Sequence, residues 1–398
     1  MRIMRSLVAA GALAVTAATV MAAPAMADPI NSHKHKVTPA AYDIVSVGSE
    51  SIAAISDQLS FNFNLAVRHH SPSHPFYYSW DGVPTGQPNN TSQHVTLKTG
   101  CRNIRPDGSS AGISALSAYG NTHFRGKTYP CVDFARSSRP RKPTDPQKAP
   151  GGVVFDTLWQ DGVTYATTSN TNAPNNLTLN QLAEIFGCTV PAAHNFPANT
   201  WGALLGPSAK GASQAIDPVL PQAGSGTLSF FAGVLQIATT EPTCGTAKSL
   251  TTDQQPEENE GISKVFLVGR KANPNVIYPF SIGAWVAQQY HSAKCGKRPS
   301  KGQNMFGCNV NGVFHLNGIH GVAPTVKPRH GSPVTNPKFL RTPFRRFLYA
   351  VVPFDATTSN HFPARLQGLL GKRGYFCKQL KVVTAYGFVP TGLCGLPV

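Results

Sequence analysis

Three short turns carry the residues of this sequence that could bind an anion. They read Gly-Ser-Glu-Ser at 48–51, Gly-Ser-Ser-Ala-Gly at 108–112 and Gly-Ser-Gly-Thr at 224–227, and each precedes a predicted helix. The first turn of a helix presents unpaired N–H groups and the positive end of the helix dipole. Glycine lets the backbone approach a ligand, and serine and threonine hydroxyls add donors. Each turn alone also fits an ordinary helix cap, but their repetition predicts an anion-binding pocket.

The turns do not match the motifs of nucleotide binding or of a nucleophilic serine. The sequence has no G-x-x-x-x-G-K-[ST] loop, and no G-x-G-x-x-G follows the first predicted strand. The residues around Ser225 do not form a G-x-S-x-G turn, and no histidine and acid stand at the spacing of a triad. We therefore expect that the protein is not an enzyme.

Strands and helices alternate along the chain. The apolar periodicity predicts strands at 43–47, 95–97, 153–167 and 348–352, helices at 51–67, 108–118, 177–186, 228–237 and 362–370, and an extended segment at 381–388. A strand and a helix are also predicted within 276–290. Two segments, 68–93 and 291–340, are rich in turn-forming residues and are predicted as loops. This alternation is typical of an α/β fold.

The first 27 residues have the pattern of a secretory signal. Arg2 and Arg5 precede an apolar stretch at 7–20, and Ala-Met-Ala at 25–27 supplies a cleavage site. The apolar stretch is too short for a transmembrane helix, and no cysteine stands at the cleavage site to carry a lipid. We expect a signal peptide at 1–27, a flexible leader at 28–40, and a secreted or periplasmic protein without a membrane anchor.

The eight cysteines all lie after the expected signal peptide. An even number in an exported chain predicts four disulfides, and no pair has the C-x-x-C spacing of a zinc or redox site. Many connectivities are open, and we favour sequential pairing because each loop then stays within one block of the chain. This pairing joins Cys101 to Cys131, Cys188 to Cys244, Cys295 to Cys308, and Cys377 to Cys394.

The charge is sparse but strongly basic. The chain has 35 lysines and arginines against 18 acidic residues, and only 13% of its residues are charged. The basic clusters, of which 341–346 is one, lack the regular alternation with aromatic residues that is typical of single-strand binding. We interpret them as solvated surface and expect no nucleic-acid partner.

Two further groups of titratable residues are interpreted without a site. Glu257, Glu258 and Glu260 precede an apolar run and are interpreted as charges at the start of a helix. His69 and His70 lie near His74, but no nearby cysteine or carboxylate completes a set of ligands. We expect no metal and no cofactor.

Four segments of the chain resemble one protein family. They are 108–112 (GSSAG), 132–138 (VDFARSS), 177–186 (LTLNQLAEIF) and 224–227 (GSGT), the last of which opens a phenylalanine-rich helix. In this order and spacing they resemble the type II periplasmic binding proteins, specifically the phosphate-binding components of phosphate transporters and their secreted relatives. The resemblance covers most of the chain from residue 42 onward. It implies an α/β fold of two lobes with a ligand cleft between them.

The resemblance also implies a binding site. In the family, the residues that match Ser109, Ser225 and Thr227 contact phosphate, and the turn supplies backbone amides at the position of Gly226. The predicted ligand-binding residues are Ser49, Ser51, Ser109, Ser110, Arg136, Ser138, Ser225, Gly226 and Thr227.

Two departures from the family concern the charge of this site. Ser138 stands where the family has an aspartate that accepts the proton of phosphate, and Pro-Gln-Ala at 221–223 replaces the family's arginine and acid. Arg136 and Arg139 are expected to supply positive charge instead.

These observations predict the organisation and the function together. Residues 41–164 and 277–398 are expected to form one lobe, and residues 165–276 the other. The predicted function is capture of a small oxyanion, phosphate first and sulfate as an alternative, by a monomer for which the resemblance implies an ABC permease as partner. Two other classes stay open, namely an extracellular enzyme acting on phosphate or sulfate esters, and a surface or polyanion-binding protein that has lost the family ligand.

Overall fold

The structure is a computed structural model. It describes residues 28–29, 36–67, 69–82, 93–245, 249–250, 254–261, 263–268, 271–291, 314–329, 331–359 and 361–398. The signal peptide predicted at 1–27 and the predicted pairing of Cys295 with Cys308 lie outside these residues. Within the described ranges, no helix combines the length and the apolar character needed to cross a membrane.

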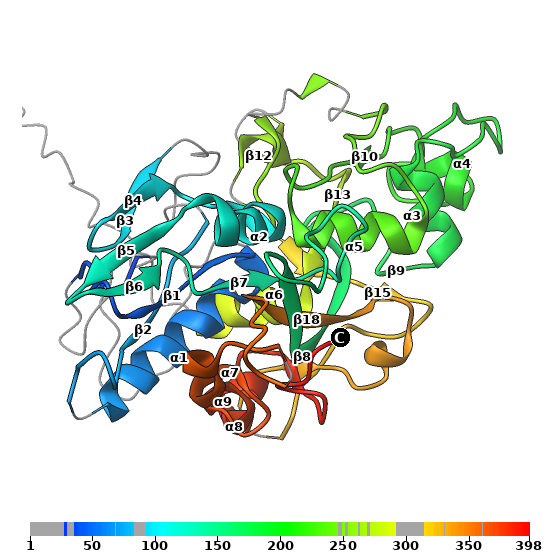
Figure 1. Cartoon of the computed structure of the whole chain (residues 1–398). Coiled ribbons are helices and arrows are strands. Elements are labelled where there is room, and N and C mark those ends of the chain that lie inside the picture. Colours follow the sequence, from blue (N-terminus) through cyan, green and yellow to red (C-terminus); the bar gives the residue numbers. More distant parts are fainter. Residues whose placement is uncertain are drawn as a thin grey trace, which may run out of the picture.

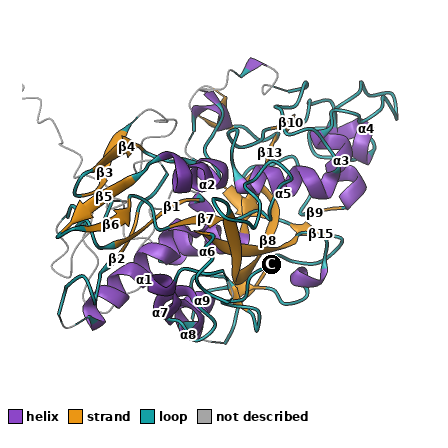
Figure 2. Cartoon of the chain, in the orientation of Figure 1, coloured by secondary structure: helices purple, strands orange, loops and turns teal. Residues whose placement is uncertain are grey.

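A mixed sheet, nine-stranded in the described part of the chain, forms the frame of the molecule (Figure 1, Figure 2). Seven strands follow one another in the order β2 (Tyr77–Ser79), β1 (Ile44–Gly48), β7 (Phe134–Ser137), β18 (Arg345–Pro353), β8 (Val153–Thr168), β13 (Val276–Ser281) and β10 (Asp217–Pro218). Two more, β14 (Phe314–Leu316) and β19 (Val389–Pro390), also pair with β8. Since β1 is parallel to β7, the carboxyl ends of both strands lie at the same edge of the sheet.

Strand β8 connects the two halves of this sheet. It pairs with β18 over Val153 to Gly162, and its next residues, from Val163 to Ala166, pair with β13. All sixteen of its residues are buried except Gln160, which is half-buried. The strand therefore passes from one part of the interior into another without leaving the sheet.

Helices cover the sheet and pack with it to form hydrophobic cores, of which two are the largest in the described residues (Figure 1). The α-helices of the described residues are α1 (Ala53–Ala66), α2 (Gly108–Ala118), α3 (Leu179–Phe186), α4 (Trp201–Leu205), α5 (Gly226–Leu235), α6 (Ile282–Tyr290), α7 (Gln367–Leu370), α8 (Tyr375–Lys378) and α9 (Leu380–Ala385). Short 3-10 turns precede α1 and α7, at Glu50–Ile52 (η1) and Ala364–Leu366 (η6).

The first core joins both ends of the described chain. It packs α1, β1, β7, the first part of β8 and α7 to α9, with Trp159 and Phe376 fully buried within it. In Figure 1 the blue α1 and the orange-red α7 to α9 accordingly lie side by side. The predicted helix at 108–118 is confirmed as α2, whereas 381–388 is not extended as expected, because Val383 buries its side chain in this core from a helix, α9.

The second core lies beyond the crossing of β8. It packs α3, α4 and α5 against the end of β8, with Trp201 and Phe231 fully buried. Three residues from the C-terminal part of the chain, Ile319, Phe339 and Phe344, also pack there. The α/β class is confirmed by these layers, and the lobe boundaries near residues 165 and 276 stay a prediction.

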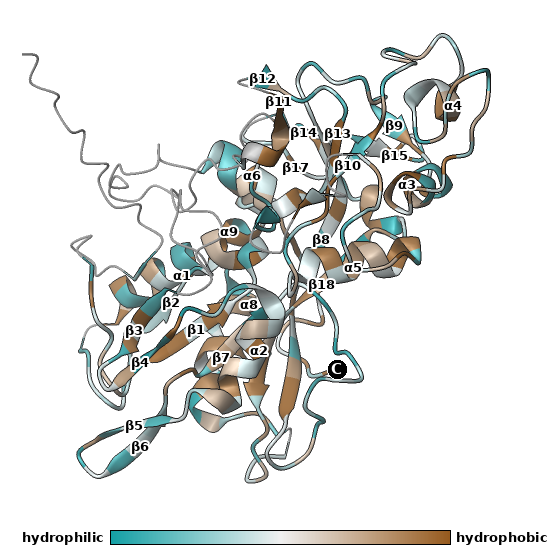
Figure 3. Cartoon of the chain, turned by 90° about the horizontal axis from the view of Figure 1, so that it is seen from above, coloured by the Kyte–Doolittle hydropathy of each residue, from teal (hydrophilic) through white to brown (hydrophobic). Residues whose placement is uncertain are grey.

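Short two-stranded ladders, separate from the main sheet, lie in both parts of the molecule. Those in the described residues are β3 (His94–Lys98) with β4 (Cys101–Ile104), β5 (Asn121–Phe124) with β6 (Lys127–Pro130), β9 (Asn176–Leu177) with β15 (Gly318–Ile319), β11 (Leu267–Val268) with β12 (Lys271–Ala272), and β16 (Thr325–Val326) with β17 (Val334–Thr335). Figure 3 shows that the ladder of β5 and β6 is mainly hydrophilic, whereas β1 is mainly hydrophobic. This contrast fits a solvated ladder beside a buried strand.

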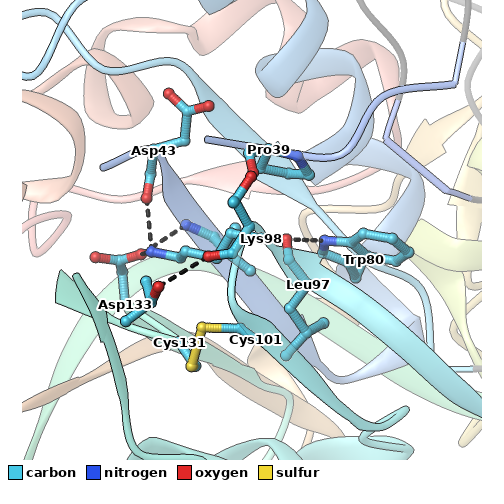
Figure 4. The surroundings of a disulfide bond; sticks show 11 residues. Pro39, Asp43, Trp80, Leu97, Lys98, Cys101, Cys131 and Asp133 are labelled. Atoms are coloured by element: carbon cyan, nitrogen blue, oxygen red, sulfur yellow. Dashed lines mark hydrogen bonds and ion pairs between the residues drawn. A yellow bond between two sulfur atoms is a disulfide. The ribbon is translucent and has the colours of Figure 1, made fainter. Parts of the chain in front are cut away.

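Three predicted disulfides are confirmed, joining Cys101 to Cys131, Cys188 to Cys244, and Cys377 to Cys394. Figure 4 shows the first of them beside a buried ion pair, in which Lys98 Nζ lies 2.7 Å from Asp133 Oδ2. Burial lowers the pKa of Lys98, against the effect of the Asp133 carboxylate. The disulfide and the ion pair together fix the segment that precedes β7. Strand β7 in turn leads to the predicted site residue Ser138.

Candidate functional site

The first glycine of each predicted turn has a left-handed backbone. The φ angles are +111° at Gly48, +73° at Gly108 and +92° at Gly224, a region that other residues rarely adopt. A Cβ atom on Gly48 would in addition lie 2.6 Å from the carbonyl oxygen of Arg136. Glycine is therefore required to turn the chain sharply from strand or extended segment into helix at these points.

In two of the turns, the serine at the second position caps the following helix. Ser49 precedes η1 and accepts a hydrogen bond from Ser51 N at 3.3 Å. Ser225 precedes α5 and accepts one from Leu228 N at 3.0 Å. Helix α2 differs, because its N-cap residue Asp107 makes no capping hydrogen bond with its side chain. Helix capping therefore explains the serines at 49 and 225, but it does not explain the serines in the turn at 108–112.

Six hydroxyl side chains converge at the edge of the sheet. We call them the hydroxyl cluster, formed by Ser49, Ser51, Ser109, Ser138, Ser225 and Thr227. Each is at most 2% exposed.

Direct hydrogen bonds connect members of the cluster from distant parts of the chain. The Oγ atoms of Ser49 and Ser138 lie 2.8 Å apart, and Ser138 N donates to Ser109 Oγ at 3.1 Å. Ser51 Oγ lies 3.0 Å from Thr227 Oγ1, which belongs to α5. The cluster therefore lies between elements of the first core and a helix of the second.

The approach of α5 to this cluster depends on Gly226. A Cβ atom at this position would overlap the Oγ atoms of Ser109 and Ser138 and lie 3.2 Å from the backbone carbon of Ser138. The absence of a side chain thus lets the first turn of α5 approach the C-terminal end of β7 and the first turn of α2.

A carboxylate of the chain itself lies at the centre of the hydroxyl cluster. Glu258 Oε1 accepts hydrogen bonds from Ser49 Oγ at 2.9 Å, from Ser51 N at 3.1 Å and from Ser51 Oγ at 3.2 Å. Its other oxygen, Oε2, accepts hydrogen bonds from Ser225 Oγ and, at 3.1 Å, from Thr227 N. Donors from the first turns of two helices therefore hold one negative charge.

The Glu258 carboxyl is ionised in this environment. Burial by itself would raise its pKa. The Ser225 hydrogen bond, the Arg346 guanidinium and the Thr227 N–H outweigh burial, so the pKa of Glu258 lies below its ordinary value. The site thus stabilises a negative charge at a buried position.

The two neighbouring glutamates behave in the opposite way. Burial, helped by the Asp107 charge, raises the pKa of Glu257 to about 11. Burial likewise raises the pKa of Glu260 to about 8. The interpretation of these acids as charges at the start of a helix is wrong, because they lie in a turn whose side chains are buried: Glu257 and Glu258 are 1% exposed and Glu260 is 6% exposed.

Arg346 supplies the positive charge of the site. Its guanidinium pairs with Asp161, with Nη2 2.7 Å and Nε 2.9 Å from Oδ2. It also donates to the cluster, to Ser51 Oγ at 3.0 Å and to Thr227 Oγ1 at 3.0 Å. Arg346 is 2% exposed, so the interpretation of 341–346 as solvated surface is wrong at this position. The sequence signal for the burial of Arg346 was the apolar run 347–352, which follows it directly in the same strand.

Arg136 and Ser110, which the sequence also assigned to the site, make other contacts. Arg136 is fully buried, and its guanidinium donates to backbone carbonyls under the first turn, among them Ser49 O at 3.3 Å and Trp80 O at 2.7 Å. Ser110 Oγ accepts from Arg139 Nη2 at 3.2 Å. Arg136 therefore supports the turn from beneath, and the positive charge that contacts the cluster is that of Arg346.

The histidines that the sequence grouped together are held elsewhere. His70 Nε2 lies 2.6 Å from Asp43 Oδ1, and His74 contacts serines of its own loop. Among the residues that the structure describes, no group of three or more histidine, cysteine or acidic side chains is arranged to hold a metal ion.

The most similar solved structures include phosphate receptors of low sequence identity. An ABC-type phosphate transport receptor from Vibrio cholerae is 15% identical, with 88% of this chain and 100% of that chain covered and a TM-score of 0.48. A putative phosphate ABC transporter substrate-binding protein from Clostridium perfringens, with bound phosphate, is 14% identical over 88% and 99% of the two chains, with a TM-score of 0.49. A phosphate-binding protein from Stenotrophomonas maltophilia is 12% identical over 88% and 91%, with a TM-score of 0.41. No curated protein matches the sequence.

The family itself is shown by the sequence. A family model described as the PBP superfamily domain matches residues 87–317, which is more than half of the chain. The match spans α2, β7, β8, α5 and β13, and thereby includes four of the six residues of the hydroxyl cluster as well as Glu258. The resemblance drawn from the motifs is confirmed at this level, as is the α/β fold with two lobes. The chain belongs to the PBP superfamily, the periplasmic binding proteins.

Proposed function

We propose that this protein is a secreted, non-catalytic binding protein that captures a small oxyanion, phosphate first, at the hydroxyl cluster. The observation that carries the proposal is the convergence of donors from two helix N-termini on one buried negative charge. The N–H groups of Ser51 and Thr227 and the hydroxyls of the cluster supply the hydrogen bonds, and Arg346 adds positive charge. An anion of the size of a carboxylate or a phosphate fits such a set of donors.

Phosphate ranks first because of the motifs that the chain shares with phosphate-binding relatives. The turns at 108–112 and 224–227 supply Ser109, Ser225 and Thr227, which match the family's phosphate contacts. Sulfate is the second candidate, because Ser138 can donate as well as accept and so does not demand a proton on the ligand. The ABC permease partner and secretion through residues 1–27 belong to the same proposal.

Ester hydrolysis by Ser225 is the competing function. Its hydroxyl does have a carboxylate within reach, since Ser225 Oγ donates to Glu258 Oε2. A general base works best when its pKa lies near the working pH, whereas the pKa of Glu258 is lowered. Glu258 is therefore a poor base for activating the serine, and the geometry favours binding.

Calorimetric titration tests the proposed function. The full chain without its signal peptide is stripped of ligand by unfolding and dialysis and titrated with phosphate, sulfate and arsenate, at pH values below and above the second ionisation of phosphate. Thr227→Val removes a hydroxyl of the cluster and should weaken binding at least about tenfold, the worth of one hydrogen bond to a charged group. Ser110→Ala is the matched control, because Ser110 Oγ contacts Arg139 instead.

Two results would refute the proposal. One is the absence of heat with all three anions, both for the native chain and for chains without the Glu258 carboxylate. The other is turnover of a chromogenic phosphate ester that Ser225→Ala abolishes, which would establish the enzyme instead.

A further inference from the structure

The Glu258 carboxylate is held as a ligand is held, and not as a helix cap. A capping side chain belongs to the start of the helix that it caps. Glu258 instead comes from a separate loop, 254–261, and accepts the N–H groups of Ser51 and Thr227 from two different helices. This is the kind of position at which oxyanions bind in proteins. The carboxylate therefore uses the donors that the proposed function assigns to an external oxyanion.

The loop that carries Glu258 is fixed on both sides of this residue. Before it, Tyr278 OH donates to the carbonyl oxygen of Glu257 at 2.6 Å. After it, Gln288 Nε2 donates to the carbonyl oxygen of Asn259 at 2.8 Å. Because the carboxylate is delivered by an anchored loop of the same chain, its effective concentration at the site is that of an intramolecular group.

Two anions do not fit into this site together. The Glu258 carboxylate is 1% exposed and ionised, and it engages both helix N–H groups. A second negative charge within hydrogen-bonding distance would be repelled strongly at this buried position, where the effective dielectric constant is low. It would also lack the donors that compensate for its loss of hydration. Binding of an external oxyanion thus requires that Glu258 leave.

We propose that Glu258 is an intramolecular ligand of the anion site, and that a free oxyanion binds only by displacing it. This inference rests on the proposed function and adds its regulation. The native chain then binds phosphate more weakly than its donors allow, by the fraction of molecules in which the carboxylate has left the site. Any contact that withdraws the loop 254–261 would raise the affinity for phosphate.

Replacing Glu258 tests this inference in the full chain without its signal peptide. Glu258→Ala removes the competing group, and Glu258→Gln keeps its volume while removing its charge. The matched control is Glu257→Gln, because burial already keeps the Glu257 carboxyl protonated, with a pKa of about 11, and it is not a ligand of the cluster. Titration with inorganic phosphate should give a dissociation constant at least about tenfold lower for Glu258→Ala, and about a hundredfold lower if the site is free about 1% of the time in the native chain. Glu257→Gln should bind as the native chain does.

Thermal unfolding provides a second readout if a variant folds poorly. Without anions, Glu258→Ala should melt at a lower temperature than the native chain, because the donors of the cluster lose their acceptor. Added phosphate should then raise the melting temperature of Glu258→Ala more than that of the native chain or of Glu257→Gln.

The outcomes separate this inference from the proposed function. If the native chain and both Glu258 variants bind phosphate with the same affinity, the inference is overturned and the proposed function stands. If phosphate, sulfate and acetate neither bind to nor stabilise any of these proteins, both are overturned. A selective gain in the Glu258 variants supports both.

Discussion

Arg346 offers the sharpest test of how the anion site is built. Its guanidinium and the carboxylate of Asp161 are at most 2% exposed and lie 2.7 Å apart. Removing one partner of such a buried pair leaves an uncompensated charge, which costs about 3–5 kcal/mol. The same change would cost at most about 1 kcal/mol at a solvated position. We therefore expect Arg346→Met to lower the free energy of unfolding by about 4 kcal/mol.

Urea-induced unfolding, followed by circular dichroism, measures this loss. Arg345→Met is the matched control, because Arg345 is the next residue of β18 and is exposed. Arg346→Lys keeps the charge but loses the planar fork, so it should cost less than Arg346→Met and provides a variant that folds more readily. In a double-mutant cycle, Asp161→Asn and Arg346→Met together should cost about 2 kcal/mol less than the sum of the single losses. A loss for Arg346→Met no larger than for Arg345→Met would refute the reasoning.

Two further predictions concern packing and pH. Gly226→Ala should lower the free energy of unfolding by about 1–3 kcal/mol and weaken phosphate binding at least about tenfold, since its methyl group would overlap Ser109 and Ser138; equal titrations of variant and native chain would contradict this. Burial raises the pKa of the Asp156 carboxyl from 3.8 to about 8. Between these two pH values the folded protein keeps a proton that the unfolded chain releases. The free energy of unfolding should therefore fall as the pH rises from about 4 to about 8, by at most about 5 kcal/mol. Asp156→Asn should flatten this fall in urea titrations at several pH values, and an unchanged pH dependence would show that Asp156 does not titrate in this way.

The sequence was sufficient to predict the turns that form the hydroxyl cluster. Glycine at 48, 108 and 224 has a local cause, the positive φ angle, and the helices that follow the first and third of these glycines begin with a serine cap. Local causes of this kind can be recognised without the rest of the chain. The helix α2 could be predicted from its local pattern, and three of the disulfides could be predicted because each joins cysteines that follow one another in the sequence.

Glu258 and Arg346 could not be predicted, because their roles arise from contacts between distant segments. Glu258 is separated from Ser49 by 209 positions, and Arg346 from Ser51 by 295. Each lies within a charged stretch whose composition resembles a solvated surface. Only the fold shows that the donors of the hydroxyl cluster surround Glu258 and that a buried carboxylate, Asp161, pairs with Arg346.

The path of β8 has a consequence for the synthesis of the protein. In the part of the chain that the structure describes, the strands that pair with it, namely β13, β14, β18 and β19, all begin at Val276 or later. Until these segments have been synthesised, both edges of this long strand, which is buried in the folded protein, therefore lack their partners. Open apolar edges recruit strands of other molecules. We expect premature termination anywhere between β8 and β18 to yield aggregates in place of a folded first lobe, and a chaperone that shields residues 153–168 to be most needed in that interval.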